Sequence, residues 1–444
     1  MGDEPRGVNR PLRIVVIGAG AAGLVAAAEA SLRMGQGNEG LPSEIVLLEK
    51  NRKTGVKILM SGGTRCNITQ DTDARGIAAA FGKSGRFLQK SVGAFPPEDV
   101  VRMFHRLGVA TKVEETGKIF PKSDRALHVR DALQQQAIAA GVQIRLKASV
   151  GEVVPTAAGW RVGLSADGSD GEGSIECDRV IITAGGRSWP GCGTTGDAYD
   201  WLRGLGHTIV RPRPALVPLV GGSDWTKSLS GLTLDDCIAS VYRRDDWKGV
   251  PSKKRKPLVS RRSSWLFTHF GFSGPAAMDV SGAMTAAKQF EETRCVVDFL
   301  PEIAVESLAD ELRSGGGRRR VSTVLAQWLP NRFAASLAEQ SGGDITLAEL
   351  SKQQFERLVA AMKYSELPVH GTRGFEKAEV TAGGVAVGEV DSRTMQSRLH
   401  RGLYIAGEVL DVDGWIGGYN FQAAFSTGRA AGIAAADSLT EFGR

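Results

Sequence analysis

The chain has 444 residues, of which 42% are hydrophobic and 23% charged, with a formal net charge of +6 at neutral pH. These values fit a soluble globular protein with a substantial core, and the length predicts two or three folded units. The sequence contains no run of about 18 apolar residues without a charge, which argues against a transmembrane helix. Its polar, acid-containing start argues against a signal or transit peptide. We therefore expect a cytoplasmic protein without a membrane partner.

The five cysteines are odd in number and form no C-x-x-C pair. This pattern favours reduced thiols over a disulfide framework or a metal site. Cys66 and Cys192 are candidates for a redox pair of the disulfide-reductase type. Their spacing is unlike that of such pairs, so buried or idle thiols are the preferred interpretation.

The positive charge is concentrated in KKRK at 253–256, in Arg261 and Arg262, and in RRR at 318–320. Such runs beside proline or glycine are typical of solvated loop tips. No aromatic residues are interleaved with them in the manner of single-strand-binding proteins. Nucleic acid is therefore not the expected partner, although it stays open as an alternative.

The first predicted βαβ unit begins with an apolar strand at 12–17, directly followed by GAGAAG at 18–23 and an alanine-rich helix. In such a loop Gly18 permits the tight turn, Gly20 lets a pyrophosphate approach the backbone, and Gly23 lets helix and strand pack closely. The helix N-terminus offers free N–H groups and a partial positive charge to phosphates.

The unit closes with the strand SEIVLLE, which ends in Glu49. An acid at this place holds ribose hydroxyls and prefers the free diol of FAD or NAD to a 2′-phosphate. The distance from Gly23 exceeds the usual spacing of about 20 residues, and GQGNEGLPSE accounts for the insertion. Strand, glycines, helix, strand and acid in this order predict one dinucleotide site.

A second G-x-G-x-x-G, GCGTTG at 191–196, also lies between a strand and a helix. The residues RSWP separate it from its strand, and no second ribose acid follows, so it is not expected to bind another dinucleotide. Thr194, Thr195 and Asp197 are the kinds of residue that cap a helix N-terminus. We therefore predict a capped helix start here.

Several further stretches carry a family resemblance. They are KILMSGGTRCN (57–67), TAGGRSWPGCGTTGDAYDWLRGLGHTI (183–209), LFTHFGFSGPAAMDVSG (266–282), AEVTAGGVAVGEVDSRTMQS (378–397) and GLYIAGEVLDVDGWIGGYNFQAAFSTGRAAG (402–432). Together with the first glycine loop they resemble the BaiN/RdsA-type, aminoacetone-oxidase-like NAD(P)/FAD-dependent oxidoreductases. The resemblance runs from residue 13 to 432.

The resemblance implies an α/β fold in which both chain ends build a Rossmann-like FAD-binding domain, with another domain inserted between them. The expected FAD-binding parts are 1–215 and 370–444. The insert, 216–369, is expected to be β-rich over 216–301 and helical over 302–369, since alternation gives way there to helical apolar spacing.

The motifs and the resemblance together assign the cofactor contacts to glycine loops, strand ends and one helix start. The residues expected to bind FAD are Gly18, Gly20, Ala21, Ala22, Gly23, Glu49, Lys50, Lys57, Arg65, Cys66, Asn67, Val150, Ala184, Gly185, Gly186, Gly407, Glu408, Gly417, Gly418, Tyr419 and Asn420. Glu408 is expected at the ribityl hydroxyls. The helix that starts at GGYN is expected to face the flavin pyrimidine and to favour negative charge on the reduced ring.

The chain departs from the family pattern in the stretch SGGTRCN, where Thr64 stands in place of a third glycine. If this position needs a positive φ, a threonine is costly there. In the wider class that includes fumarate reductases, a T-G-D-G sequence starts a helix beside the flavin. Here the corresponding residues are 195–198, with Ala198 in place of the last glycine.

The resemblance implies that LFTHFGFSG belongs to an insert that faces the flavin and supplies the substrate wall. Thr268 and Ser273 are candidate substrate contacts, and His269 is a candidate proton donor because an imidazole titrates near neutral pH. A histidine between aromatic residues is also commonly structural, so both interpretations stay open.

These observations predict an FAD-dependent oxidoreductase that transfers a hydride between flavin N5 and a small organic substrate. With one dinucleotide unit, NAD(P)H would dock transiently on the flavin face as reductant. A flavin-dependent RNA-modifying enzyme and a flavin-binding regulatory protein are the alternatives. The substrate, the electron acceptor and the oligomeric state do not follow from the residues.

Overall fold

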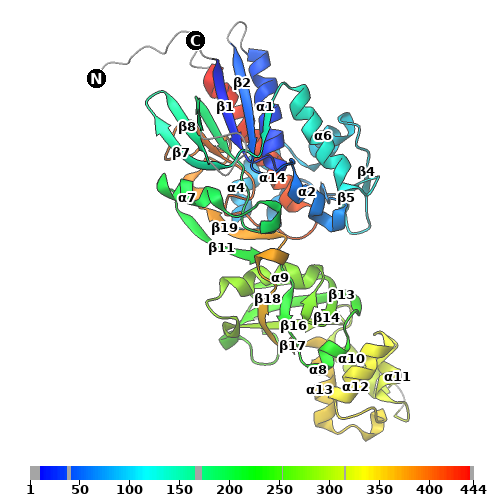
Figure 1. Cartoon of the computed structure of the whole chain (residues 1–444). Coiled ribbons are helices and arrows are strands. Elements are labelled where there is room, and N and C mark those ends of the chain that lie inside the picture. The colour runs from blue at the N-terminus through cyan, green and yellow to red at the C-terminus, as the bar shows by residue number, and fades with distance from the viewer. Residues whose placement is uncertain (1–10, 38–41, 166–172, 253, 315–316, 441–444) are drawn as a thin grey trace. The chain divides into compact units, whose positions relative to one another are not determined.

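The structure is a computed structural model that describes residues 11–37, 42–165, 173–252, 254–314 and 317–440. Parts of two expectations, the insertion at 38–41 and Lys253 of the basic run, lie outside these residues. The chain forms two compact units, one from Met1–Pro212 with Glu379–Arg444 and one from Arg213–Ala378. The prediction that both chain ends build one domain around an insert is confirmed (Figure 1).

The first unit is built on a parallel sheet of order β20-β10-β1-β2-β6. Its strands are β20 (Leu403–Ile405), β10 (Arg179–Ile182), β1 (Leu12–Ile17), β2 (Ser43–Glu49) and β6 (Gln143–Leu146). β1 is fully buried over its last four residues because helices or loops cover both faces, as in parallel sheets generally. Since all strands run the same way, their carboxyl ends meet at one edge, where ligands of open α/β sheets bind.

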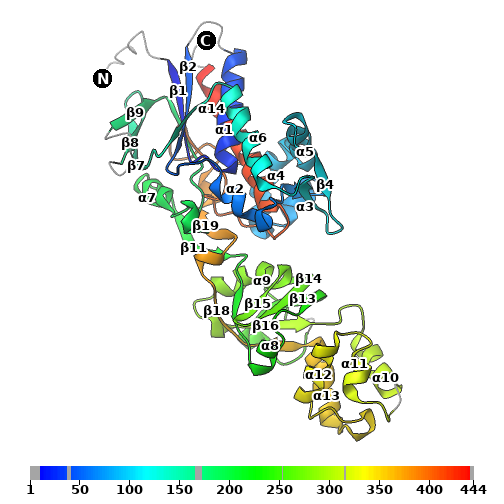
Figure 2. The ribbon, with the colours of Figure 1, turned by 45° about the vertical axis from the view of Figure 1, so that its right-hand side comes forward.

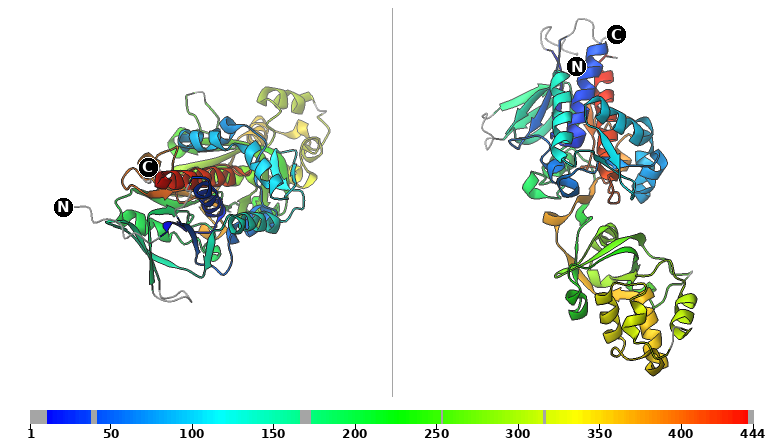
Figure 3. Two further views of the ribbon diagram at one scale, coloured as in Figure 1. Left: turned by 90° about the horizontal axis from the view of Figure 1, so that it is seen from above. Right: turned by 90° about the vertical axis from the view of Figure 1, so that its right-hand side faces the viewer.

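Two long helices pack together beside this sheet, α1 (Ala21–Gly37) and the C-terminal α14 (Tyr419–Thr440) (Figure 3). Glycines of α14 allow the close approach: a Cβ at Gly428 would lie 2.3 Å from the carbonyl oxygen of Ala22, and one at Gly432 would lie 2.3 Å from that of Ala26. The last helix therefore fixes the helix that follows the first glycine loop.

The rest of this unit surrounds the sheet with shorter elements (Figure 2). The helices are α2 (Val56–Met60), α3 (Ala74–Ala79), α4 (Gly85–Ala94), α5 (Pro97–Arg106), α6 (Ala126–Ala139) and α7 (Asp197–Gly204). One antiparallel sheet joins β3 (Thr69–Gln70), β5 (Lys118–Pro121) and β4 (Thr111–Val113). Another joins β7 (Val150–Thr156), β8 (Gly159–Leu164) and β9 (Gly173–Cys177), and β11 (Ile209–Ala215) pairs with β19 (Val380–Val385).

The second unit contains an antiparallel sheet and a group of helices, as expected for the insert. The sheet has the order β17 (Ser365–Leu367), β16 (Thr293–Asp298), β13 (Thr233–Arg243), β14 (Val259–Thr268), β15 (Gly271–Ser273), β12 (Leu219–Gly221) and β18 (Val369–Thr372). The helices are α8 (Asp224–Ser228), α9 (Pro275–Ala286), α10 (Val305–Ser314), α11 (Val321–Leu325), α12 (Asn331–Gln340) and α13 (Lys352–Lys363). Its core is aromatic, with Trp265, Phe267, Phe272 and Phe333 fully buried.

None of the helices in the described part of the chain is long and apolar enough to span a membrane. All five cysteines are free and buried.

Candidate cofactor site

The GAGAAG loop joins the end of β1 to the start of α1. A Cβ at Gly18 (φ 102°) would lie 2.7 Å from the carbonyl oxygen of Thr183, and one at Gly23 would lie 1.8 Å from the carbonyl oxygen of Gly18. These two glycines are therefore required by the fold itself. Gly20 is different, because no described atom lies within 4 Å of its added Cβ. The loop thus leaves open space in front of the α1 N-terminus, where a phosphate can approach the backbone.

Glu49 at the end of β2 is held beside this loop. Its carboxylate accepts hydrogen bonds from the backbone N–H groups of Ala19 and Asn51, each at 2.9 Å, and the residue is only 8% exposed. A carboxylate has about four acceptor positions. Two backbone bonds orient Glu49 and leave capacity for the two hydroxyls of a ribose.

The GCGTTG loop and the start of α7 are hydrogen-bonded to Lys50 and Asn51, which follow Glu49. Nζ of Lys50 donates to Oγ1 of Thr195 at 2.6 Å and to Oδ2 of Asp197 at 2.5 Å, while Nδ2 of Asn51 donates to the carbonyl of Cys192 at 3.0 Å. Burial acts to raise the pKa of Asp197, but the bonds from Lys50 and Thr195 outweigh it and hold that pKa below its ordinary value.

The predicted side-chain cap of this helix is wrong. The N-cap position of α7 is Gly196, whose φ of 84° lies in the left-handed region and which has no side chain to offer. Oγ1 of Thr194 instead donates to the carbonyls of Ser188 and Trp189, and Thr195 donates to Asp197. The hydroxyls therefore brace the loop and do not cap the helix.

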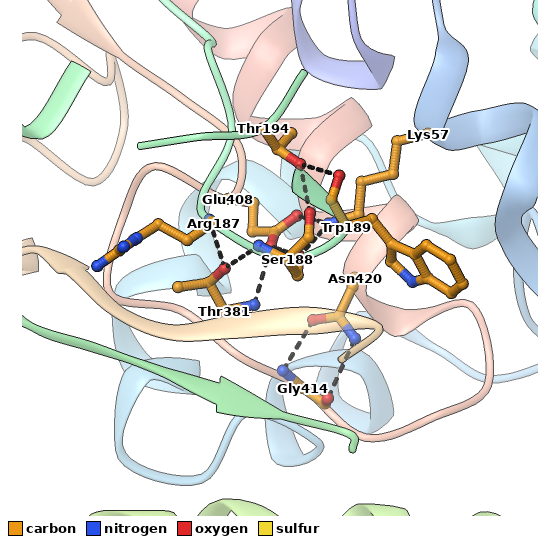
Figure 4. Close-up of polar contacts among 9 residues, drawn as sticks. All are labelled: Lys57, Arg187, Ser188, Trp189, Thr194, Thr381, Glu408, Gly414 and Asn420. Carbon is orange, nitrogen blue, oxygen red and sulfur yellow. Dashed lines mark hydrogen bonds and ion pairs between the residues drawn. The ribbon is translucent and has the colours of Figure 1, made fainter. Parts of the chain in front are cut away.

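Lys57 and Glu408, which are 351 positions apart, form the centre of a polar cluster (Figure 4). Nζ of Lys57 lies 2.5 Å from Oε2 of Glu408 and 2.5 Å from Oγ of Ser188, which itself donates to Oε1 of Glu408 at 2.7 Å. The backbone N–H of Thr381 adds a bond to Oε1 at 2.9 Å. Glu408 therefore accepts hydrogen bonds from an ammonium, a hydroxyl and an amide.

Thr381 also orders the segment after β10. Its Oγ1 accepts from the backbone N–H groups of Arg187 at 2.7 Å and Ser188 at 3.0 Å. A Cβ at Gly186 would lie 2.4 Å from this same hydroxyl oxygen, so Gly186 permits the contact. The strand ends of β10 and β20 and the start of β19 thus converge on one place.

Tyr199 of α7 brings an uncommitted hydroxyl to the same region. The residue is 4% exposed, and its buried hydroxyl has no hydrogen-bond partner among the described residues. Burial, and then the charge of Glu408, raise the pKa of this phenol above its ordinary value, with Arg187 acting in the opposite sense. A buried donor without a partner is costly, so Tyr199 is suited to donate to a bound ligand.

The start of α14 is shaped by glycines and by Asn420. A Cβ at Gly418 (φ 89°) would lie 2.6 Å from backbone atoms of Thr69, so only glycine fits there. The amide of Asn420 accepts from Gly414 N at 2.9 Å and donates to the Gly414 carbonyl at 3.1 Å (Figure 4). Asn420 therefore joins the start of α14 to Gly414 in the preceding loop. Gly417 and Tyr419 lie between these two residues in the sequence.

Comparison with known proteins gives the family. The model of the HI0933-like protein Rossmann domain matches residues 12–434. The chain is 30% identical over 93% of its length to the ribosomal RNA dihydrouridine synthase of Escherichia coli, of which it covers 95%. It is 31% identical over 96% of its length to the 3-dehydro-bile acid delta(4,6)-reductase of Clostridium scindens, of which it covers 99%.

The chain belongs to the HI0933-like family. This is the BaiN/RdsA type of flavin-dependent oxidoreductase that the motifs resemble. Among solved structures, the 3-ketosteroid-delta4-(5alpha)-dehydrogenase of Rhodococcus jostii RHA1 is 14% identical, with a TM-score of 0.48 over 97% of this chain and 98% of that one.

The residues present fit the FAD that the family implies. Gly20 has open space in front of it, Glu49 keeps free acceptor capacity, and the buried hydroxyl of Tyr199 lacks a partner within the described structure. Ala184 and Gly185 follow β10 after Thr183, and a Cβ at Gly407 would lie 2.8 Å from that of Ala22. These residues thus lie beside the first glycine loop.

The SGGTRCN loop of this HI0933-like chain has unusual backbone geometry. Gly62, Gly63 and Thr64 have φ values of 55°, 65° and 69°, and Cys66 has 62°. Thr64 therefore does occupy the left-handed conformation that favours glycine. Burial raises the pKa of the Cys66 thiol to about 12, so this fully buried cysteine is a packed, unreactive thiol.

Arg65 is engaged by protein groups in this structure. Its guanidinium bonds to Glu114 and to Asp124, the latter at 2.8 Å, and its Cζ lies 4.0 Å from the ring centroid of Phe120. The neighbouring Asn67 is 9% exposed. Val150 begins β7, paired with Leu164. The cofactor contacts expected of these residues remain predictions.

The candidate substrate residues belong to the second unit. His269 is exposed in the turn between β14 and β15, and its ring meets that of Phe270 edge-on at 5.1 Å. Oγ1 of Thr268 is buried without a partner among the described residues, while Oγ of Ser273 lies 3.9 Å from Sδ of Met278. Their roles toward a substrate also remain predictions.

Sequence reasoning missed Ser188, Tyr199 and Thr381, which lie inside the stretches RSWP, GDAY and AEVT that carry the family resemblance. Their presence in those stretches was the available signal. The bonds of Ser188 and Thr381 could not be predicted, because each joins segments that are distant in the chain.

Proposed function

We propose that this protein binds one FAD in the first unit and transfers a hydride between flavin N5 and a small organic substrate, with NAD(P)H as the reductant. The observation that carries the proposal is the GAGAAG loop, in which Gly18 and Gly23 are packed and Gly20 faces open space. Bound FAD would supply the hydride chemistry. The residues of the chain would bind the cofactor, orient it and set the electrostatic environment of the flavin.

Each half of the cofactor has matching groups. The α1 N-terminus and Gly20 suit the pyrophosphate, and Glu49 suits the adenosine ribose. Glu408, fixed by Lys57 and Ser188, suits the ribityl hydroxyls. The N-terminus of α14 would favour negative charge on the flavin pyrimidine, which promotes hydride acceptance. Reduction of a double bond is supported as the reaction class by the relative named as a delta(4,6)-reductase.

The experiment is anaerobic stopped-flow reduction of the purified, FAD-loaded protein with NADH and with NADPH, followed by the visible flavin absorbance. We expect rapid bleaching with one or both, and reoxidation by an unsaturated substrate. A protein that cannot be loaded with FAD would overturn the proposal. An FAD-loaded protein that no nicotinamide or metabolite reduces would instead support the regulatory alternative.

Modification of RNA is the second candidate. It is supported by relatives named ribosomal RNA dihydrouridine synthase and by the basic residues of the second unit. Several of these residues have acidic partners, since Arg261 bonds to Asp279 at 2.8 Å and Arg262 bonds to Asp236 at 2.6 Å and to Glu302. Retention on ribosomal RNA that falls steeply with salt would favour this candidate, and no binding at low salt would remove it.

A further inference from the structure

The connection between β13 and β14 in the second unit carries a concentration of positive charge (Figure 1). The segment 243–262 contains nine lysines and arginines and only two acidic residues. The ladder of the two strands ends where Val241 pairs with Val259, and the backbone N–H of Leu258 donates to the carbonyl of Val241 at 2.7 Å. The cations on both sides of the connection therefore lie at one end of this hairpin.

Most of these cations have no acidic partner within the described residues. Arg261 of β14 is paired with Asp279 at 2.8 Å. Its neighbour Arg262 is paired with Asp236 and with Glu302. The cations nearer the turn form no ion pair in the described part of the chain, and they are Arg243, Arg244, Lys248, Lys254, Arg255 and Lys256. Five of these six side chains are exposed and one is half-buried, so positive charge without a counter-charge gathers at the hairpin end.

Trp247 fixes the base of the charged segment to the sheet. The residue is 7% exposed, and its ring centroid lies 4.8 Å from that of Tyr242. Its Nε1 donates to Oε2 of Glu366 at 3.0 Å. Lys248 follows Trp247 directly, so its backbone is fixed by these contacts. Cations on a fixed segment lose less conformational freedom on binding than cations on a free tail, which favours binding of a polyanion.

The segment offers charge but no surface on which bases could stack. Trp247 is the one aromatic residue of 243–262, and it is buried. Proteins that hold single strands stack bases on exposed aromatic rings, whereas phosphates require only lysine and arginine. Base-paired RNA is recognised chiefly through its phosphates and 2′-hydroxyls, because its major groove is too deep and narrow for side chains. The chemistry that fits the segment is therefore the phosphate backbone of a duplex.

We propose that the hairpin end, residues 243–256, is a docking surface for the phosphate backbone of base-paired RNA. The inference rests on the second candidate function, modification of RNA, and names the part of the chain that would hold the RNA. Each phosphate that a lysine or arginine neutralises releases a condensed counterion, so the complex is stabilised at low salt and weakened as salt rises. Contacts to phosphates carry no base information, so the affinity should depend little on base sequence.

Two variants with the same loss of charge test the surface. In the hairpin variant three exposed lysines of the segment become glutamine: Lys248→Gln, Lys254→Gln and Lys256→Gln. In the control variant three exposed lysines elsewhere in the second unit become glutamine: Lys227→Gln, Lys288→Gln and Lys352→Gln. Both variants should keep the thermal stability and the FAD binding of the wild type, because the substituted side chains are exposed.

The Kd of the FAD-loaded full chain is measured for an RNA duplex of about 20 base pairs, longer than the about 16 that a double-strand-binding domain spans. Fluorescence anisotropy of a red dye on the RNA gives the Kd between about 50 and 200 mM salt. The hairpin variant should bind at least about tenfold more weakly at the lowest salt. Its slope of log Kd against log salt should fall by about three, about one for each lost phosphate contact. The control variant should match wild type, and equal losses in both variants, or none in the hairpin variant, would overturn the proposal.

Other polyanions are tested as competing ligands. Val250 and Leu258 expose apolar side chains in the same segment, which would suit a lipid surface. Vesicles of phosphatidylcholine with phosphatidylserine, a DNA duplex and single-stranded poly(U) are therefore titrated in the same way. Tighter binding to any of them than to the RNA duplex would overturn base-paired RNA as the partner.

A second readout uses the unmodified chain. Trypsin cleaves after exposed lysines and arginines, so bound RNA duplex should slow cleavage after Lys254 and Arg255 and leave cleavage after Lys352 unchanged. Mass spectrometry of the fragments measures both rates. Equal slowing at all three positions would overturn the proposal.

The outcome for the surface is separable from the outcome for the second candidate function. RNA that binds through the hairpin end but undergoes no change of its bases with NAD(P)H would establish the surface and remove RNA modification. RNA that wild type and the hairpin variant modify equally would keep that function and overturn the surface. Absence of RNA binding by wild type at low salt would overturn both and leave the flavin chemistry untouched.

Discussion

Two segments that lead from a strand to a helix have the spacing G-x-G-x-x-G, and their glycines have different roles. In GAGAAG two glycines are enforced by backbone contacts and the middle one faces open space before a helix N-terminus. In GCGTTG the glycines at 193 and 196 permit left-handed turns against Asn51 and Arg187, and a Cβ at Gly191 would meet no described atom within 4 Å. The same spacing therefore leaves open space before a helix N-terminus in one place and forms a braced turn in the other. The difference lies in the close contact of Gly18 with Thr183, which follows β10.

The largest effect is a loss of stability expected from substitution of Gly23, where the first loop is most tightly packed. Gly23→Ala places a methyl group 1.8 Å from the carbonyl oxygen of Gly18. Such overpacking should lower the free energy of unfolding by about 3 kcal/mol, measured by urea denaturation. Gly191→Ala is the control and should leave stability unchanged. Equal stability of Gly23→Ala and Gly191→Ala would contradict the different packing of the two loops.

The acidic residues beside the two loops, Glu49 and Asp197, should differ in how much they contribute to FAD affinity. Glu49→Gln weakens the charged acceptor of Ala19 and of the ribose, and should weaken FAD binding about ten- to hundredfold, as for hydrogen bonds to charged groups. Asp197→Asn removes a half-exposed ion pair with Lys50, which is worth about 0–1 kcal/mol, so affinity should fall by less than about fivefold. Calorimetric titration of both variants with FAD measures the contrast. A larger loss in Asp197→Asn would reverse the assignment.

A pH effect should appear at the segment that follows GCGTTG and α7. His207 is 2% exposed; its Nδ1 lies 3.1 Å from Oε2 of Glu389 and its Nε2 lies 2.9 Å from Oγ of Ser397. Burial lowers the pKa of His207; Glu389 acts in the opposite sense and His400 adds to the lowering. The unfolded chain therefore binds a proton more readily, and stability should fall as the pH drops below about 6.5.

Urea unfolding at a series of pH values checks this expectation. His207→Gln should show a smaller loss of stability on acidification than wild type, because the buried group that resists protonation is gone. His128→Gln, which changes an exposed histidine, should behave as wild type. An identical pH dependence in all three proteins would contradict the account.

The smallest effect concerns a third loop, SGGT. Thr64 has a φ of 69°, where a side chain costs about 1–2 kcal/mol. Thr64→Gly should raise the free energy of unfolding by up to about 1 kcal/mol, since the greater freedom of glycine in the unfolded chain offsets part of the gain. Thermal unfolding measures it. A lower melting temperature in the variant would show that the threonine side chain makes a stabilising contact.

The sequence was informative where a contact is local. The strand, glycines and helix at 12–37 could be predicted because the loop closes on itself, and Glu49 follows in the next strand. The cap of α7 was predicted wrongly, because Lys50, far away in the chain, draws Asp197 away from a capping role. Lys57 and Glu408 were each predicted to bind FAD, but the ion pair between them was not predicted.

The central claim is that GAGAAG, and not GCGTTG, is the phosphate loop of the single dinucleotide. The direct test is the FAD affinity and stoichiometry of Gly20→Ala beside Gly191→Ala, since neither added methyl group meets a described atom within 4 Å and both variants should fold. The account predicts one FAD per wild-type chain, a loss of affinity of about ten- to hundredfold in Gly20→Ala from overpacking against the phosphate, and wild-type affinity in Gly191→Ala. Equal losses in the two variants, or two FAD molecules per chain, would contradict it.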